Sequence, residues 1–283
     1  MVSTVKEKYL SKVPTWYKSR NKFETVLSDD VDGLVSTSLL KFCKNWNVEY
    51  FYDFNTLYAS NNLYFRENKS ATRVWADVSI VVHDAMTFDN HVNRMNLQDY
   101  TNPNAINPNI LDDITNENYF NKYAGSTALL IWDLYKVPLP STEEGKMLLL
   151  CIDSTFKGFY HASYREANRH FLCDVLDMEE LYEVLKRHTS SEFYQMIDKY
   201  ELNKKIWVNA DGQLQTNLNI ELLAELLEIP VELPTLKMNE YMEFESKFAQ
   251  YYGTSIKNIK GVATLALTGK NKCSYSVVKK KTK

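Results

Sequence analysis

Residues 22–42, KFETVLSDDVDGLVSTSLLKF, contain the pattern that decides the fold. An apolar run ends at Leu27 and is followed by the acidic segment SDDVDG over residues 28–33. Apolar residues then recur at helical spacing from Leu34 to Phe42. This order predicts a strand, an acidic turn and a helix.

The same alternation continues along the first part of the chain. We expect strands over residues 48–52, 73–80 and 86–88, and helices over 127–134 and 142–152. The segment 93–118 is rich in Asn and Pro and has no period, which predicts a long surface loop. Strands that alternate with helices indicate an α/β fold, with a mainly parallel sheet flanked by helices and function at the carboxyl ends of the strands.

A change of texture near residue 175 predicts two domains, 1–175 and a smaller helical lobe over 176–283. In the second we expect helices over 178–199, 220–227 and 238–251 and a terminal hairpin of 262–267 with 274–278. No acidic residue follows Glu245, whereas lysines continue to the end of the chain. This basic segment is either a solvated tail or a surface that attracts a polyanion.

Composition limits the classes of protein to which the chain can belong. The chain has 283 residues, of which 45% are hydrophobic and 24% charged, and this excludes a disordered protein. No apolar run approaches the roughly 20 residues of a membrane span, and the first residues do not resemble a signal peptide, so we expect a cytoplasmic protein without a membrane partner. The four cysteines are far apart and form no C-x-x-C pair, which favours reduced thiols over a zinc site or disulfides.

Several aspartates stand where a predicted strand or apolar helix ends. They are Asp30, Asp32, Asp77, Asp89 and Asp153. One such aspartate is usually a helix cap or a turn residue. Carboxylates that gather at one sheet edge, about 4 Å apart, would repel by roughly 4 kcal/mol per pair at an effective dielectric of 20. Such a cluster needs protons or a cation, and its oxygen ligands would suit Mg²⁺ or Mn²⁺.

The ordered set of acidic motifs resembles a known family. The motifs are Asp30-Val31-Asp32-Gly33, the lone Asp77, Asp89-Asn90-His91 and Asp153-Ser154-Thr155-Phe156-Lys157. Over about residues 20–165 they look like those of the DHH phosphoesterase superfamily, so the first domain is expected to be DHH-like. The resemblance implies hydrolysis of a phosphodiester or phosphoanhydride in a nucleotide or a short single-stranded oligonucleotide.

The resemblance also implies a metal centre. By analogy, Asp30 and Asp32 would each ligate one manganese ion, Asp77 would bridge the two ions, and Asp153 would complete the second site. A metal-bridging hydroxide would then attack the phosphorus. Asn90 stands at a ligand position of the family, and His91 at a position that touches the substrate phosphate.

Two positions depart from the family pattern. Histidines that ligate metal in the family are replaced by Ser28 and Asn90. Hydroxyl and amide oxygens are harder donors than imidazole, so the site favours Mg²⁺, binds one ion instead of two, or no longer performs chemistry. The nearby His83 and Asp84 could supply a replacement ligand.

Basic residues near the fourth motif are candidate phosphate ligands. Lys157 lies in the motif itself, and Arg165 and Arg169, one helical turn apart, could contact phosphate oxygens or form a solvated helix face. The chain lacks the glycine-rich substrate motif of the family's second domain. Lys270 and Lys272, at the predicted hairpin tip, could take its place.

Two other functions remain open from the sequence. A haloacid dehalogenase-type phosphatase would use Asp30 as nucleophile and Asp32 as general acid, but it needs a further acidic pair at a strand end. The available pair, Asp112 and Asp113, lies in the Asn-rich segment. A catalytically degenerate DHH-like protein would instead bind a nucleotide or nucleic acid, or serve in an assembly. The sequence predicts no oligomeric state.

Overall fold

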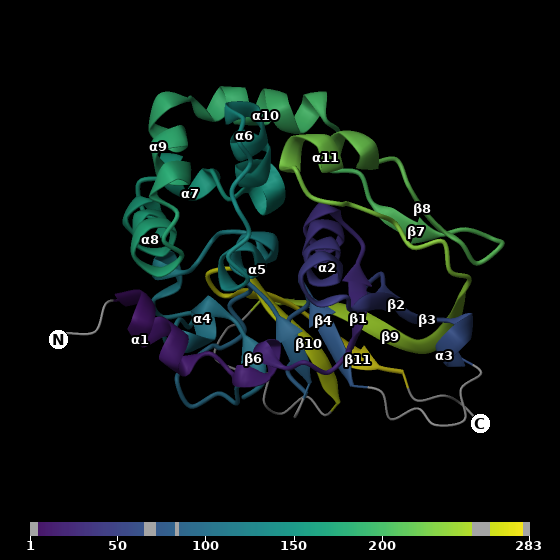
Figure 1. The fold of residues 1–283 in the computed structure, drawn as a ribbon. Coiled ribbons are helices and arrows are strands. Elements are labelled where there is room, and N and C mark those ends of the chain that lie inside the picture. Colours follow the sequence, from purple (N-terminus) through teal and green to yellow (C-terminus); the bar gives the residue numbers. More distant parts are fainter. Residues whose placement is uncertain (1–4, 65–71, 83–84, 251–260, 280–283) are drawn as a thin grey trace.

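The computed structural model describes residues 5–64, 72–82, 85–250 and 261–279. His83 and Asp84 lie outside these residues, as do Lys257 and Lys260 of the basic C-terminal segment. Within the described residues, nine strands form one sheet in the order β10-β11-β9-β3-β2-β1-β4-β5-β6. Most of the longer helices lie on one side of it (Figure 1).

The sheet begins as the predicted parallel unit. Its parallel strands are β1 (Glu24–Ser28), β2 (Asn47–Tyr52), β4 (Arg73–Ala76), β5 (Met86–Phe88) and β6 (Ala105–Ile106). The helix α2 (Val31–Lys44) follows β1 through the acidic turn and packs on β1, β2 and β4. The predicted α/β class is confirmed.

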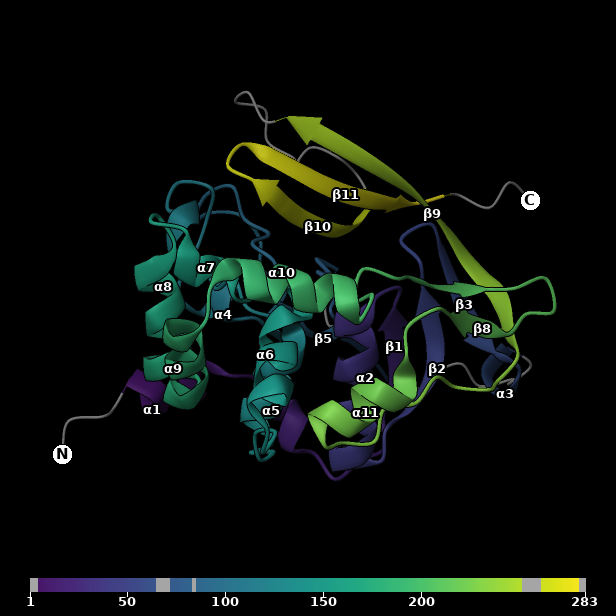
Figure 2. The ribbon, with the colours of Figure 1, turned by 90° about the horizontal axis from the view of Figure 1, so that it is seen from above.

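The C-terminal strands extend this sheet in antiparallel fashion. They are β3 (Thr56–Ser60), β9 (Met238–Gln250), β11 (Lys272–Val278) and β10 (Val262–Gly269). Figure 2 shows β9 continuing from beside β3 to the hairpin of β10 and β11. The predicted hairpin is confirmed, whereas the helix expected over 238–251 is wrong, because the described residues of that segment form β9. The exposed edge of β3 offers backbone donors and acceptors, and pairing with them outweighs local helix preference.

The β10–β11 hairpin folds back over the loops that follow β4 and β5. Leu265 N donates to Ser79 O at 3.1 Å, and Leu267 N donates to Val92 O at 2.7 Å. The sheet therefore curls, so that Phe244 and Ala263 share a buried cluster with Trp75 of β4. Sequence periodicity contains no information about this closure.

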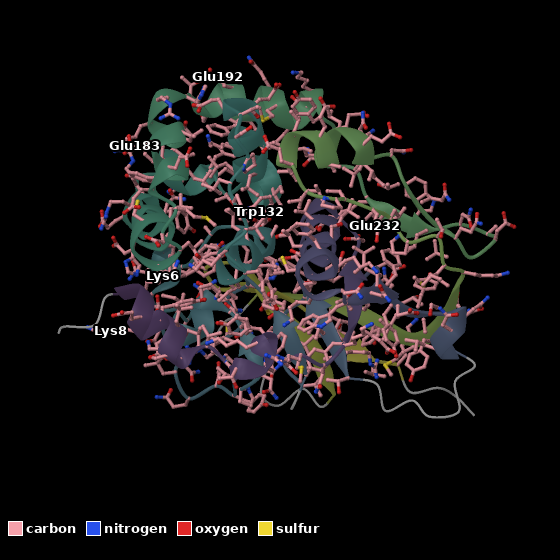
Figure 3. All side chains as sticks on the ribbon, viewed as in Figure 1. Lys6, Lys8, Trp132, Glu183, Glu192 and Glu232 are labelled. Carbon is pink, nitrogen blue, oxygen red and sulfur yellow. The ribbon has the colours of Figure 1, made fainter. Side chains whose placement is uncertain are left out.

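The main helices form two layers above the sheet (Figure 1). The lower layer is α2 and α5 (Thr127–Leu134); the upper layer is α6 (Glu143–Cys151), α9 (Glu179–Arg187), α10 (Ser190–Lys199) and α11 (Ile220–Leu227). Trp132 of α5 is fully buried in the middle of the molecule (Figure 3). The helices predicted over 127–134, 142–152 and 220–227 are confirmed to within a residue or so at their ends. The segment 178–199 is divided into α9 and α10 at Thr189, which caps α10.

The smaller elements complete the fold. They are α1 (Val5–Lys12), α3 (Asn61–Tyr64), α4 (Pro108–Leu111), α7 (Lys157–Tyr160), α8 (Arg165–Arg169), β7 (Ile206–Val208) and β8 (Leu214–Thr216). The loop expected over 93–118 contains β6 and α4, and many of its asparagines are buried because they bond to backbone groups. The four cysteines, which lie in the described residues, form no disulfide there. In the part of the chain that is described, no helix is long and apolar enough to cross a membrane.

Candidate functional site

The predicted acidic motifs meet at the carboxyl ends of the parallel strands. Asp32 lies in the first turn of α2, just beyond β1, and is 2% exposed. Its two carboxylate oxygens accept hydrogen bonds from Thr127 N and Ala128 N, each at 2.8 Å. Thr127 Oγ1 donates to Asp77 Oδ1 at 3.1 Å. The start of α5 therefore joins the first motif to the second.

Two helices direct their N-termini at this point. The N-cap of α2 is Asp30 and that of α5 is Ser126, and each side chain accepts a hydrogen bond from the first turn of its helix. The partial positive charge of a helix N-terminus stabilises nearby anions. The arrangement favours negative side chains, and it also favours an anionic ligand.

Asp30 thus has the capping role that is common for an aspartate in this position. Its Oδ1 accepts from Gly33 N at 3.2 Å. Its Oδ2 receives a bond from Lys205 Nζ at 3.4 Å, and Lys205 also donates to Asp29 Oδ1 at 2.9 Å. A capping role does not remove Asp30 from the cluster, because its charge acts on the carboxyls of Asp32 and Asp77.

Asp77 and Asp153 both have left-handed backbone conformations. Their φ angles are 59° and 48°, and Ser154, which follows the second, has a φ of 54°. Residues other than glycine adopt this region at a cost on the order of 1–3 kcal/mol, and such strain is concentrated at functional sites. Asp77 is buried, while solvent reaches Asp153. Beside Asp153 a cavity of about 160 Å³ is lined by Asp30, Asp32 and Lys205, among others.

Asn90 connects the third motif to the fourth. Its Nδ2 donates to Asp153 Oδ2 at 2.7 Å and to Gly125 O at 2.9 Å. Its Oδ1 is buried and has no hydrogen-bond partner. A buried acceptor without a partner is costly in a folded protein, so this oxygen is a candidate ligand for a cation.

His91 is held by Asp89. The distance from His91 Nδ1 to Asp89 Oδ1 is 2.7 Å, and Asn107 Nδ2 donates to Asp89 Oδ2 at 2.7 Å. Burial alone would lower the pKa of His91, but the charge and hydrogen bond of Asp89, together with the charge of Asp153, outweigh it and raise the pKa. The pairing fixes the ring and leaves Nε2 as the nitrogen that can meet a ligand.

Burial and mutual repulsion raise the pKa values of carboxyl groups in the cluster. Burial, followed by the charges of Asp153 and Asp30, raises the pKa of Asp32 to about 8. Burial and the charge of Asp32 raise the pKa of Asp77 well above its usual range, and burial raises that of Asp153. The shifts of Asp32 and Asp77 have the sign that arises when buried like charges lack a cation to balance them.

The residues present fit a divalent cation in their chemistry. Carboxylate and amide oxygens are suitable donors for Mg²⁺ or Mn²⁺, and Asn90 Oδ1 has no other partner. Among the described residues, however, no group of three or more His, Cys, Asp or Glu side chains is arranged to hold a metal ion. Binding would therefore require carboxylates of the cluster to turn toward a common point.

Of the other predicted residues, Ser28 lies beside Asp77, whereas Lys157, Arg165 and Arg169 have partners elsewhere. Ser28 Oγ is 3.5 Å from Asp77 Oδ2, at the limit of a hydrogen bond. Lys157 Nζ lies 5.5 Å from the centre of the Tyr194 ring. Arg165 Nε donates to Phe159 O at 2.8 Å, and Arg169 NH2 donates to Asp174 Oδ2 at 3.0 Å. These contacts do not join the lysine and the arginines to the carboxylates.

Three site residues were not found from the sequence. Thr127 stands at the start of the helix predicted over 127–134, but nothing in the sequence indicates that it bonds both Asp32 and Asp77. Lys205 is 175 positions from Asp30, so no local pattern links them. Lys122 lies just beyond the Asn-rich segment; burial lowers its pKa, and the charges of Tyr164 and Asp153 oppose this effect.

Comparison with known proteins gave no match to a protein-family model, a curated protein or a solved structure.

Proposed function

We propose that this chain is a divalent-metal-dependent phosphoesterase. Its substrate would be a phosphodiester or phosphoanhydride in a nucleotide or a short single-stranded oligonucleotide, and its cofactor Mg²⁺ or Mn²⁺, as one or two ions. One observation carries the proposal: Asp32, Asp77 and Asp153, from three separate segments, gather beside Asn90, whose Nδ2 bonds Asp153 and whose Oδ1 is buried without a partner.

In this proposal, different residues of the chain would bind the cation and contact the phosphate. Asp32, Asp77, Asp153 and Asn90 would hold the cation, which when bound supplies positive charge and lowers the pKa of a water molecule. His91, oriented by Asp89, would donate a hydrogen bond or proton from Nε2 to a phosphate oxygen. The helix N-termini of α2 and α5 would add to the positive potential at the phosphate.

The dehalogenase-type alternative has less support. A nucleophilic Asp30 would need a free carboxylate, but its two oxygens face Gly33 N and Lys205 Nζ. Of the candidate second acidic pair, Asp113 lies beside Arg94 at 3.2 Å, and Asp112 is 3.8 Å from Lys12. Neither is placed at the carboxylate cluster by these contacts.

A binding protein without turnover is the second candidate. Both oxygens of Asp32 are bonded to backbone amides, and among the described residues the acidic side chains are not arranged around one ion. Such a protein would keep affinity for a nucleotide or nucleic acid but would not hydrolyse it. A cytoplasmic location belongs to either proposal, because nucleotide ligands and unpaired thiols suit that compartment.

The test is metal uptake and turnover in one preparation. Mn²⁺ and Mg²⁺ binding would be measured by calorimetry, and hydrolysis with bis-p-nitrophenyl phosphate and an end-labelled single-stranded pentanucleotide. Asp77→Asn should lower the rate by about 100-fold or more. Asp177→Asn is a matched control, because Asp177 has a similar φ of 60° but is exposed. Unchanged turnover in Asp77→Asn would contradict the proposal, and metal or nucleotide binding without turnover would support the second candidate.

A further inference from the structure

An aromatic surface lies beside the proposed active site. It consists of Phe120, Tyr164 and His161, which we call the aromatic platform. The ring of Phe120 is 5.3 Å from that of Tyr164, and Tyr164 is 5.0 Å from His161. Phe120 is 41% exposed, His161 is exposed and Tyr164 is half-buried. Exposing several large rings to water is unfavourable, and a ligand that covers them lowers the free energy.

Two lysines flank the platform. Lys270 Nζ lies 5.9 Å from the centre of the Phe120 ring. Lys122 Nζ is 4.8 Å from the centre of the neighbouring Tyr119 ring and donates to Tyr119 Oη at 3.1 Å. Their charges would attract an anionic ligand to the rings.

The segment that carries Phe120 and the hairpin tip that carries Lys270 hold each other in place. Asn116 Nδ2 donates to Asn271 Oδ1 at 2.6 Å, and Asn271 N donates back to Asn116 Oδ1 at 2.6 Å. Tyr119 Oη donates to Leu267 O at 3.3 Å. These bonds fix the tip of the β10–β11 hairpin, which carries Lys270, against the segment that carries Phe120. A preorganised surface loses little entropy when it binds a ligand.

Asn109 ties the segment that follows Lys122 to the third motif. Its Nδ2 donates to Asn90 O at 2.7 Å and to Tyr123 O at 3.1 Å, and Tyr123 N donates back to Asn109 Oδ1 at 2.7 Å. Lys122 therefore precedes a residue that is tied to the third motif. The charges of Tyr164 of the platform and of Asp153 of the cluster both act on Lys122, so this lysine lies near both.

We propose that the aromatic platform binds the bases of a single-stranded nucleic acid, with Lys122 and Lys270 contacting its phosphates. Rings that stack on bases and cations that follow the backbone are the usual elements of single-strand binding. A duplex hides its base faces, so it would not satisfy the rings. The inference rests on the proposed function and specifies its substrate as an oligonucleotide rather than a mononucleotide.

The experiment measures binding separately from turnover. Fluorescence anisotropy with a labelled oligo(dT) hexamer in EDTA reports affinity alone. Phe120→Ala and Tyr164→Ala should each weaken binding about tenfold, while Phe120→Trp should retain it. Trp207→Ala is the matched control, since Trp207 is an aromatic residue of β7 that is 42% exposed. Lys270→Gln should lower the slope of log Kd against log salt concentration by about 0.7.

The outcomes separate this inference from the proposed function. Equal affinity in the platform variants and the wild type, no wild-type affinity, or equal binding of duplex would overturn the platform, whether or not metal-dependent hydrolysis is found. Platform-dependent binding without metal uptake or turnover would support the platform and reject the hydrolase. If Tyr164→Ala fails to fold, Phe120→Ala and the salt slope of Lys270→Gln still decide the result.

Discussion

Asn90 is held firmly by its amide nitrogen, while its carbonyl oxygen is buried without a partner. Asn168 provides a comparison, because its Oδ1 is also buried without a partner and its Nδ2 donates to Thr155 O. Only Asn90, of these two, is bonded to a carboxylate of the cluster, Asp153. Equivalent substitutions of the two asparagines therefore distinguish a metal-ligand position from a buried oxygen that merely lacks a partner.

Asn90→Asp should bind Mn²⁺ about tenfold more tightly than the wild type and be less stable without metal. The new carboxylate would lie next to Asp153, and the two charges repel unless a cation lies between them. Calorimetry and urea unfolding with and without Mn²⁺ would show both effects. Asn168→Asp, the control, should lose stability without a gain in affinity; the same gain in both variants would contradict the role of Asn90.

The buried carboxyls also predict a pH dependence for the metal-free protein. Because the pKa of Asp32 is raised from 3.8 to about 8 on folding, the folded chain keeps a proton that the unfolded chain releases. The free energy of unfolding should therefore be highest at a pH below 3.8 and should fall as the pH rises from there to about 8. The decrease should reach roughly 1 kcal/mol per pH unit. The shift of the buried Asp77 has the same sign.

Urea unfolding in EDTA between about pH 5 and 8 would measure this dependence. Asp32→Asn should flatten the decline, and a divalent cation should restore stability at the upper end of the range. A profile that is level or rises with pH in the wild type would show that these carboxyls are not protonated in the folded chain.

Among the elements, those predicted correctly are the ones whose cause is local. The strand, acidic turn and helix of residues 22–42 follow from an apolar run, a capping aspartate and helical spacing, and all three are present. Residues 238–250 lack such a cause: they are rich in residues compatible with a helix, and most of their side chains are exposed. They form a strand because β3 and β11 pair with them on both sides.

In the candidate site, too, the features with a local cause were predicted and those that depend on tertiary contacts were not. The sequence identified its aspartates because they follow strand and helix ends, where α/β proteins place functional groups. It did not identify Lys122, Lys205 or the exact bonds of Thr127, because these depend on contacts between remote segments. Residue types indicate the chemistry that a site can perform, but the hydrogen-bond partners of each group depend on the tertiary fold.

The start of α10 provides a test at the scale of one element. Thr189 Oγ1 accepts from Glu192 N, and Glu192 Oε2 accepts from Thr189 N at 2.7 Å, which completes a capping box. Glu192 lies at the outer surface of the molecule (Figure 3). Thr189→Ala should lower the free energy of unfolding by about 1 kcal/mol and the melting temperature by about 2 °C. Ser191→Ala, in the same exposed first turn, should change neither; equal effects would contradict the cap.

At the scale of the whole molecule, the two predicted domains share one sheet and one core. The strands β9, β10 and β11 come from the C-terminal part, yet β9 pairs with β3 of the N-terminal part. The main hydrophobic core extends from Leu27 of β1 through Leu149 of α6 to Phe193 of α10 and Leu227 of α11. Ile206 N also donates to Asp29 O, which joins β7 to the acidic turn.

This continuity predicts one cooperative unfolding transition for the full chain and no stable fold for residues 1–175 alone. The fragment would expose the face of α6 that packs on α9, α10 and α11 and the edge of β3 that pairs with β9. Circular dichroism and urea unfolding of fragments 1–175 and 176–283, separately and mixed, would test this. We expect cooperative unfolding only in the full chain or in the mixture. A sharp transition of the isolated 1–175 fragment would instead show that the acidic site and the rings of the aromatic platform belong to an independent domain, and that only the flanking Lys270 comes from a separable part.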